Sequence, residues 1–143
     1  MKRTLYALSL VLLLVACLAP VRAMAQGRSA AYVPVVTPNG STLPFTVRDG
    51  VKEFHLTAEP VKREFAPGMV VNAWGYNGST PGPTLEAVEG DRVRIYVTNK
   101  LPERTSVHWH GILLANGMDG VAGLNQPHIE PGETFVYEFP LKQ

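Results

Sequence analysis

The segment Arg92–Asn99 alternates between apolar and polar side chains, and this pattern constrains the fold more than any other feature of the sequence. In an extended chain, Val93, Ile95 and Val97 lie on one face and the residues between them on the other. Phe135–Phe139 alternates in the same way, and no window of the chain shows a helical period. We therefore predict an all-β protein whose strands each bury one face.

Turn signals separate the expected strands. Asp49-Gly50 predicts a hairpin between the apolar stretches on either side of it. Glu89–Asp91 and Pro131–Glu133 predict further turns, and Pro81–Pro83 interrupts any regular element. With 143 residues, 45% of them hydrophobic, the chain is long enough for one domain. Short strands separated by such turns predict an antiparallel sandwich or barrel.

The first 25 residues differ in composition from the remainder and predict a secretory signal peptide. Lys2 and Arg3 precede the apolar run Leu5–Ala19, and Ala23–Ala25 has the small residues of a cleavage site. Without paired arginines, this is a signal of the general secretory route, and we expect cleavage after Ala25 and a periplasmic or secreted product. The apolar run of about 15 residues is shorter than the ~18 expected of a membrane-spanning helix, and no later stretch comes closer.

Cys17 leaves a second possibility open, because Leu-Val-Ala-Cys resembles a lipoprotein cleavage site that would leave this cysteine lipidated. It is the only cysteine of the sequence, so residues 26–143 contain no disulfide, thiolate nucleophile or cysteine metal ligand. Cleavage removes three of the 13 basic residues and none of the 12 acidic ones, which leaves a net charge of −2. Nothing in that charge favours nucleic acid. Residues 26–44 predict a loose N-terminal arm.

Ser106–Gly111 reads SVHWHG and contains two of the four histidines of the chain. In a strand, His108 and His110 would project from one face about 6.6 Å apart, at a rise of ~3.3 Å per residue, with Val107 and Trp109 on the other. The pair suits either hydrogen-bonded surface residues or a metal site. Neutral imidazole binds copper, zinc, iron or nickel, and the spacing alone does not select among them.

Four segments in order resemble the first plastocyanin-like (cupredoxin) domain of the multicopper oxidases, and especially bacterial copper-resistance and laccase-like oxidases. They read YNGSTPGPTLEAVEGDRVRIYVTN (Tyr76–Asn99), HWHG (His108–Gly111), NGMDGVAG (Asn116–Gly123) and QPHIEPGETFVYEF (Gln126–Phe139). The resemblance implies a Greek-key β-sandwich over residues 45–143, lacking its last strands.

By this resemblance, His108 binds the type 2 copper and His110 one type 3 copper of a three-copper cluster. Asp119 has two readings: a turn residue whose carboxylate accepts hydrogen bonds from nearby backbone amides, or the family's acid that assists proton delivery. Met118 is expected to pack, and neither His55 nor His128 is expected to bind metal.

The resemblance implies an oxidase that removes single electrons from a reducing substrate, cuprous ion or a phenol, and reduces O2 to water. The type 1 copper site of this family needs a cysteine, and its cluster needs three more His-x-His pairs. Neither occurs after His110. We therefore expect the chain to be the front of a longer enzyme, or a truncated product, and to be inactive alone.

Other classes of protein are alternatives to an oxidase. A stand-alone copper-binding module without turnover would keep His108 and His110 and lack the other ligands. A metal-free interaction module would not need the pair. A zinc hydrolase would place an acid where Ile112 stands, and copper nitrite reductases share the fold but fit His-Trp-His-Gly less well.

Overall fold

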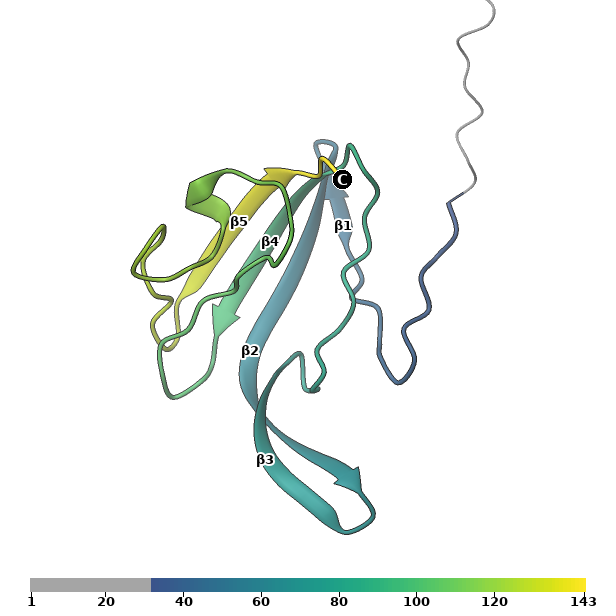
Figure 1. Cartoon of the computed structure of the whole chain (residues 1–143), viewed down its shortest axis with the longest axis vertical. Helices are drawn as coiled ribbons and strands as arrows, with labels where there is room; N and C mark the ends of the chain where they lie inside the picture. The colour runs from purple at the N-terminus through teal and green to yellow at the C-terminus, as the bar shows by residue number, and fades with distance from the viewer. Residues whose placement is uncertain (1–31) are drawn as a thin grey trace, which may run out of the picture. The chain divides into compact units, whose positions relative to one another are not determined.

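A computed structural model describes residues 32–143 and shows strands with one short 3-10 helix (Figure 1). The elements are, in order, β1 (Thr46–Arg48), β2 (Val51–Ala66), β3 (Met69–Tyr76), β4 (Arg92–Asn99), η1 (Asn116–Met118) and β5 (Thr134–Pro140). The all-β prediction is confirmed. The predicted signal peptide and Cys17 lie outside the described residues. Within residues 32–143, no helix has the length and apolarity needed to cross a bilayer.

The strands form one five-stranded sheet in the order β1-β2-β4-β5, and β3 pairs with the distal half of the long strand β2. Three of the pairs are antiparallel, whereas Val51–Ala58 runs parallel to Arg92–Asn99. The predicted antiparallel pairing was therefore wrong for β2 and β4. After β2, the chain returns through β3 and residues 77–91, so that β4 starts from the same end as β2 and runs beside it.

The predicted alternation of buried and exposed side chains is confirmed in β4 and β5, which each bury one face. Asp49 and Gly50 have φ angles of 52° and 76°, as a tight hairpin turn between right-twisted strands requires, and they join β1 to β2. The hairpin of β2 and β3 was missed. Its strand β3 has consecutive apolar residues instead of an alternation, and Met69 and Val70 remain 52% and 59% exposed. Pro67-Gly68, at its tip, was the available signal.

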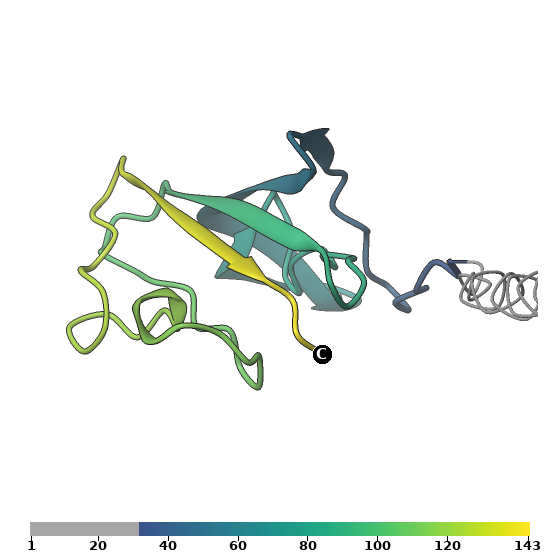
Figure 2. The same ribbon diagram turned by 90° about the horizontal axis from the view of Figure 1, so that it is seen from above.

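The core lies on one face of the sheet. Side chains of β2, β4 and β5 form it together with Leu43 and Ile129, and parts of the connections 77–91 and 100–133 pack against it. Figure 2 shows the longer connection as a layer beside β4 and β5. Within the described residues, this layer takes the place of the second sheet expected of a sandwich. Leu43 is 7% exposed and its N–H bonds the Thr84 carbonyl at 2.8 Å, so the core includes the end of the arm predicted over residues 26–44.

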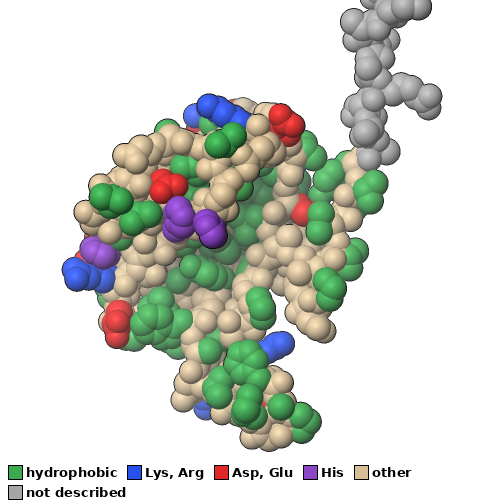
Figure 3. All heavy atoms as spheres, viewed as in Figure 1, with side chains coloured by type: hydrophobic (Ala, Val, Ile, Leu, Met, Phe, Trp, Pro, Cys, Tyr) green, Lys and Arg blue, Asp and Glu red, His purple; other side chains and the backbone are tan. Residues whose placement is uncertain are grey.

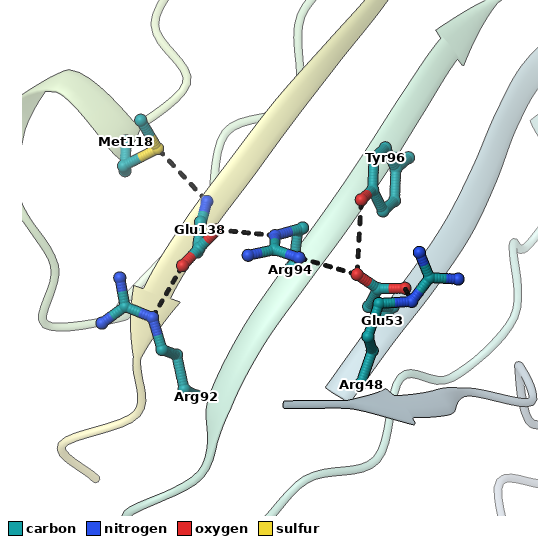
Figure 4. Close-up of polar contacts among 7 residues, drawn as sticks. All are labelled: Arg48, Glu53, Arg92, Arg94, Tyr96, Met118 and Glu138. Carbon is teal, nitrogen blue, oxygen red and sulfur yellow. Dashed lines mark hydrogen bonds and ion pairs between the residues drawn. The ribbon is translucent and has the colours of Figure 1, made fainter. Parts of the chain in front are cut away.

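The other face of the sheet carries a chain of ion pairs (Figure 4). Arg94 donates to Glu53 at 2.7 Å and to Glu138 at 2.6 Å, and Arg92 donates to Glu138 at 2.7 Å. The guanidinium of Arg94, followed by that of Arg92, holds the pKa of the Glu138 carboxyl below its usual value. Met118 of η1 accepts the backbone N–H of Glu138 with its sulfur at 3.4 Å. The sheet is thus linked to the connection that carries the histidines.

Candidate metal centre

The connection after β4 begins at a buried asparagine. Asn99 is fully buried, and its amide donates to the carbonyls of Glu103 at 2.9 Å and Ile129 at 2.8 Å. Its side-chain oxygen accepts the N–H of Leu101 at 2.9 Å. Thr105 and Ile129 then exchange two backbone hydrogen bonds. These contacts fasten both ends of the 100–133 connection to the end of the sheet, and the histidine segment starts directly after them.

The histidine segment does not form a strand, contrary to the prediction, because no neighbouring strand pairs with residues 106–111. The alternation of faces nevertheless holds. Val107 and Trp109 pack against the core, and the Trp109 ring meets Tyr137 edge-on with 5.2 Å between centroids. His108 and His110 point outward, with 5.8 Å between their ring centroids. Figure 3 shows two histidine side chains side by side on the surface.

The ring of His108 is fixed by Asp119. Nδ1 of His108 lies 2.6 Å from the backbone oxygen of Asp119, and 3.5 Å from its carboxylate Oδ2. Because a carbonyl oxygen only accepts, Nδ1 carries the proton, and in the neutral imidazole the lone pair is then on Nε2. Metal-binding histidines are commonly oriented by such a bond on the nitrogen that does not bind the metal. His108 therefore presents a free Nε2 lone pair to a ligand.

The Asp119 carboxylate accepts a hydrogen bond from the side-chain amide of Asn125 at 3.3 Å. The turn reading of Asp119 anticipated bonds from backbone amides instead. The next residue, Gly120, has φ +85°, and a Cβ there would lie 1.7 Å from the Val107 carbonyl oxygen. Sequence reasoning missed both Gly120 and Asn125 as residues of the site. Asp119-Gly120 as a turn pair was a signal for the first, but nothing local marks the second.

The two remaining histidines differ in position, since His55 lies on the sheet and His128 lies near His108. His55 is exposed and stacks on Tyr96 with 4.6 Å between ring centroids. His128 and His108 line the same open cleft, together with residues 104–106 and 120–122. In the described part of the chain, no three His, Cys, Asp or Glu side chains are grouped so that they could hold a metal ion. The candidate centre thus offers two imidazoles, which in the neutral form suit copper, zinc, iron or nickel and are an incomplete donor set by themselves.

Two kinds of known protein resemble the chain. Copper resistance protein A of Escherichia coli is 54% identical over 67 residues, which are 47% of this chain and 11% of that protein. Multicopper oxidase mco of Staphylococcus epidermidis is 35% identical over 118 residues, which are 82% and 25% of the two chains. The chain therefore spans a quarter or less of the length of these relatives.

Solved structures agree with the fold. The crystal structure of a multi-copper oxidase from Pseudomonas thermotolerans matches 64% of this chain with a TM-score of 0.62 and 44% identity, and the match covers 22% of that chain. A multicopper oxidase from Campylobacter jejuni, described as a metallo-oxidase, matches 73% with a TM-score of 0.63 and 30% identity. The fold is therefore the cupredoxin-like, all-β fold of these oxidases. The sequence profile of the family described as multicopper oxidase matches residues 57–143, which include both histidines of the pair and Asp119, and the chain belongs to this family.

Proposed function

We propose that this chain is the copper-binding N-terminal portion of a multicopper oxidase, with His108 and His110 as its first pair of copper ligands. One observation carries the proposal. The two imidazoles project together from one segment, and the Nδ1 proton of His108 is engaged by the Asp119 carbonyl at 2.6 Å, so that Nε2 remains available. By family resemblance, His108 is assigned to type 2 copper and His110 to type 3 copper.

In the whole oxidase, copper supplies the redox chemistry: single electrons from a reducing substrate, cuprous ion or a phenol, are passed on until one O2 has taken up four electrons and four protons to give two waters. The residues of this chain would hold and orient the imidazoles. Asp119 is proposed as a proton relay because its carboxylate lies 3.5 Å from His108 Nδ1 and is partly open to solvent. The names of the relatives support this reaction class and leave the substrate open. We propose export to the periplasm or the exterior on the basis of residues 1–25.

A stand-alone copper-binding module is the alternative function. Such a module would need only the paired imidazoles, and no three His, Cys, Asp or Glu side chains are grouped as metal ligands among the described residues. The family profile and the oxidases among the relatives favour the oxidase portion. Both functions require copper at the pair, so the copper site is the first thing to test.

Copper titration followed by electron paramagnetic resonance tests the site. Wild-type protein should bind Cu(II) with nitrogen hyperfine coupling, and without a strong blue absorption, because residues 26–143 contain no cysteine thiolate. The His108→Ala and His110→Ala double variant should lose this binding. His55→Ala is the matched control, since it removes an exposed imidazole from the sheet. Equal binding by the double variant and the wild type would refute the copper site.

A further inference from the structure

The side chain of Asn125 connects three parts of the loop that faces His108. Its oxygen accepts the N–H of Val121 at 2.9 Å. Its amide nitrogen lies 3.3 Å from the Asp119 carboxylate and 3.5 Å from the side-chain oxygen of Asn116. Asn116 precedes Asp119 and Val121 follows Gly120, so the three bonded residues span the Asp119-Gly120 pair. One short side chain thus closes the loop on which the acceptor of the His108 proton depends.

The loop is otherwise held by backbone hydrogen bonds within it and by Met118, whose sulfur accepts the backbone N–H of Glu138 at 3.4 Å. The 3-10 helix η1 has only three residues, and it has no side-chain cap at its N-terminus. Gly120 is pressed against the backbone of Val107 and His108, where a Cβ would have no room, so a small shift of the loop moves the Asp119 carbonyl relative to the ring. The bond from His108 Nδ1 to that carbonyl is short, at 2.6 Å. Asp119 thus meets the ring through its carbonyl and meets Asn125 through its carboxylate.

We propose that Asn125 is a positioning residue for copper binding at His108, and that it acts through Asp119. By donating to the Asp119 carboxylate and accepting from Val121, Asn125 holds the Asp119 carbonyl at His108 Nδ1 and thereby keeps the lone pair on Nε2. The effect of Asn125 on metal affinity rests on the proposed function, because it requires that His108 binds copper. The hydrogen bond of His108 Nδ1 is present without metal. The tautomer of His108 can therefore be measured in the metal-free protein.

The test uses Asn125→Asp, which keeps an oxygen for Val121, removes the amide donor and places a negative charge beside the Asp119 carboxylate. Long-range 15N–1H correlation spectra of the metal-free protein should show a single Nδ1-protonated tautomer of His108 in the wild type. In the variant, two carboxylates would face each other, and the ring should exchange between tautomers. Cu(II) affinity should fall about tenfold, as for other residues that orient a metal-binding histidine.

Two further variants separate positioning from general stability. The double change Asp119→Asn with Asn125→Asp reverses the amide–carboxylate bond, and it should restore both the single tautomer and the affinity. Asn77→Ala is the matched control, because the Asn77 side chain likewise uses both its oxygen and its amide, accepting the Thr57 N–H at 2.8 Å and donating to the His55 carbonyl at 3.0 Å. This control should lower stability and leave the His108 spectrum unchanged.

The inference is overturned if Asn125→Asp keeps the wild-type tautomer and binds copper within a factor of two of the wild type. It is equally overturned if Asn77→Ala perturbs His108 as strongly, or if the double variant is not restored. A wild type that binds no copper but shows the fixed tautomer would refute the proposed function and leave the positioning by Asn125 standing.

Discussion

Strand β4 and the histidine segment are held in place by different kinds of bond. Residues 92–98 of β4 pair in unbroken register with β5, and residues 92–99 pair with β2 on the other side. Residues 106–111 have no strand partner. Their backbone is held instead by side chains, the hydroxyl of Tyr137 at the Val107 N–H (3.1 Å) and the amide of Gln143 at the Gly111 carbonyl (2.6 Å).

The difference separates stability from function in this chain. Repeated backbone pairing and apolar burial stabilise the sheet, so the loss of one polar side chain there has a limited effect. The site depends on single contacts made by Asn99, Asp119, Gly120 and Asn125. Changes in the sheet should therefore alter the stability of the whole domain, whereas changes in the connection should alter the site first.

The largest effect is expected from Phe54→Ala in β2. Phe54 is 1% exposed and belongs to the core that both regions share. Truncating a buried phenylalanine costs about 3 to 5 kcal/mol, so both the sheet and the site should be lost together. Urea unfolding followed by circular dichroism measures the effect. A variant as stable as the wild type would show that the shared core does not support the domain.

A smaller effect is expected from Asn99→Ala, at the junction of the two regions. The change takes away the side-chain oxygen that accepts the buried N–H of Leu101, which costs on the order of 1–3 kcal/mol. It also removes one of the two donors to the Ile129 carbonyl, which keeps the Thr105 N–H. Hydrogen exchange should increase in residues 100–130 and change little in the centre of β4. Thr98→Ala, which removes a bond to Thr134 between exposed residues, is the control. Equal protection in both variants would contradict a role of Asn99 as the junction.

Gly120→Ala should affect the site more than the sheet. A methyl group there would collide with the Val107 carbonyl, and the φ of +85° is unfavourable for alanine, a strain of about 1 to 3 kcal/mol. Copper affinity should fall, while the circular dichroism of the sheet persists. Gly117→Ala, three residues earlier, adds a methyl group that meets nothing within 4 Å and should bind copper normally. Similar losses in both variants would show that the loop tolerates no substitution at all.

The smallest effect is expected from Glu138→Gln on the outer face of the sheet. Since the arginines lower the pKa of this carboxyl, its ion pairs stabilise the folded protein above the ordinary carboxyl pKa of about 4.3 and lose that contribution as the pH falls through the lower, folded-state value. The stability difference between wild type and variant should be present at pH 7 and disappear in strong acid. Denaturant titrations at both ends of this range measure it. A difference independent of pH would point to packing instead of charge.

Much of the sheet was predictable because its signals are local. The alternation in β4 and β5 and the Asp49-Gly50 turn depend on neighbours in sequence, and the structure has them as predicted. The strand β3 was not predictable in this way, because its apolar residues remain exposed on a projecting hairpin. The parallel pairing of β2 with β4 was missed for another reason. It depends on where a long connection returns the chain, which periodicity does not report.

The sequence by itself determined which residues are available for chemistry: two histidines on one face of an extended segment, an aspartate eleven residues after the first of them, and no cysteine beyond residue 17. Only the tertiary structure decided that the Asp119 carbonyl meets His108 Nδ1, that Gly120 lies against Val107, and that Asn125 holds the loop between them. The physical reason is the range of the interactions. Side-chain alternation is set by backbone geometry within a few residues, whereas an imidazole tautomer is set by whichever acceptor the folded chain brings within hydrogen-bond distance.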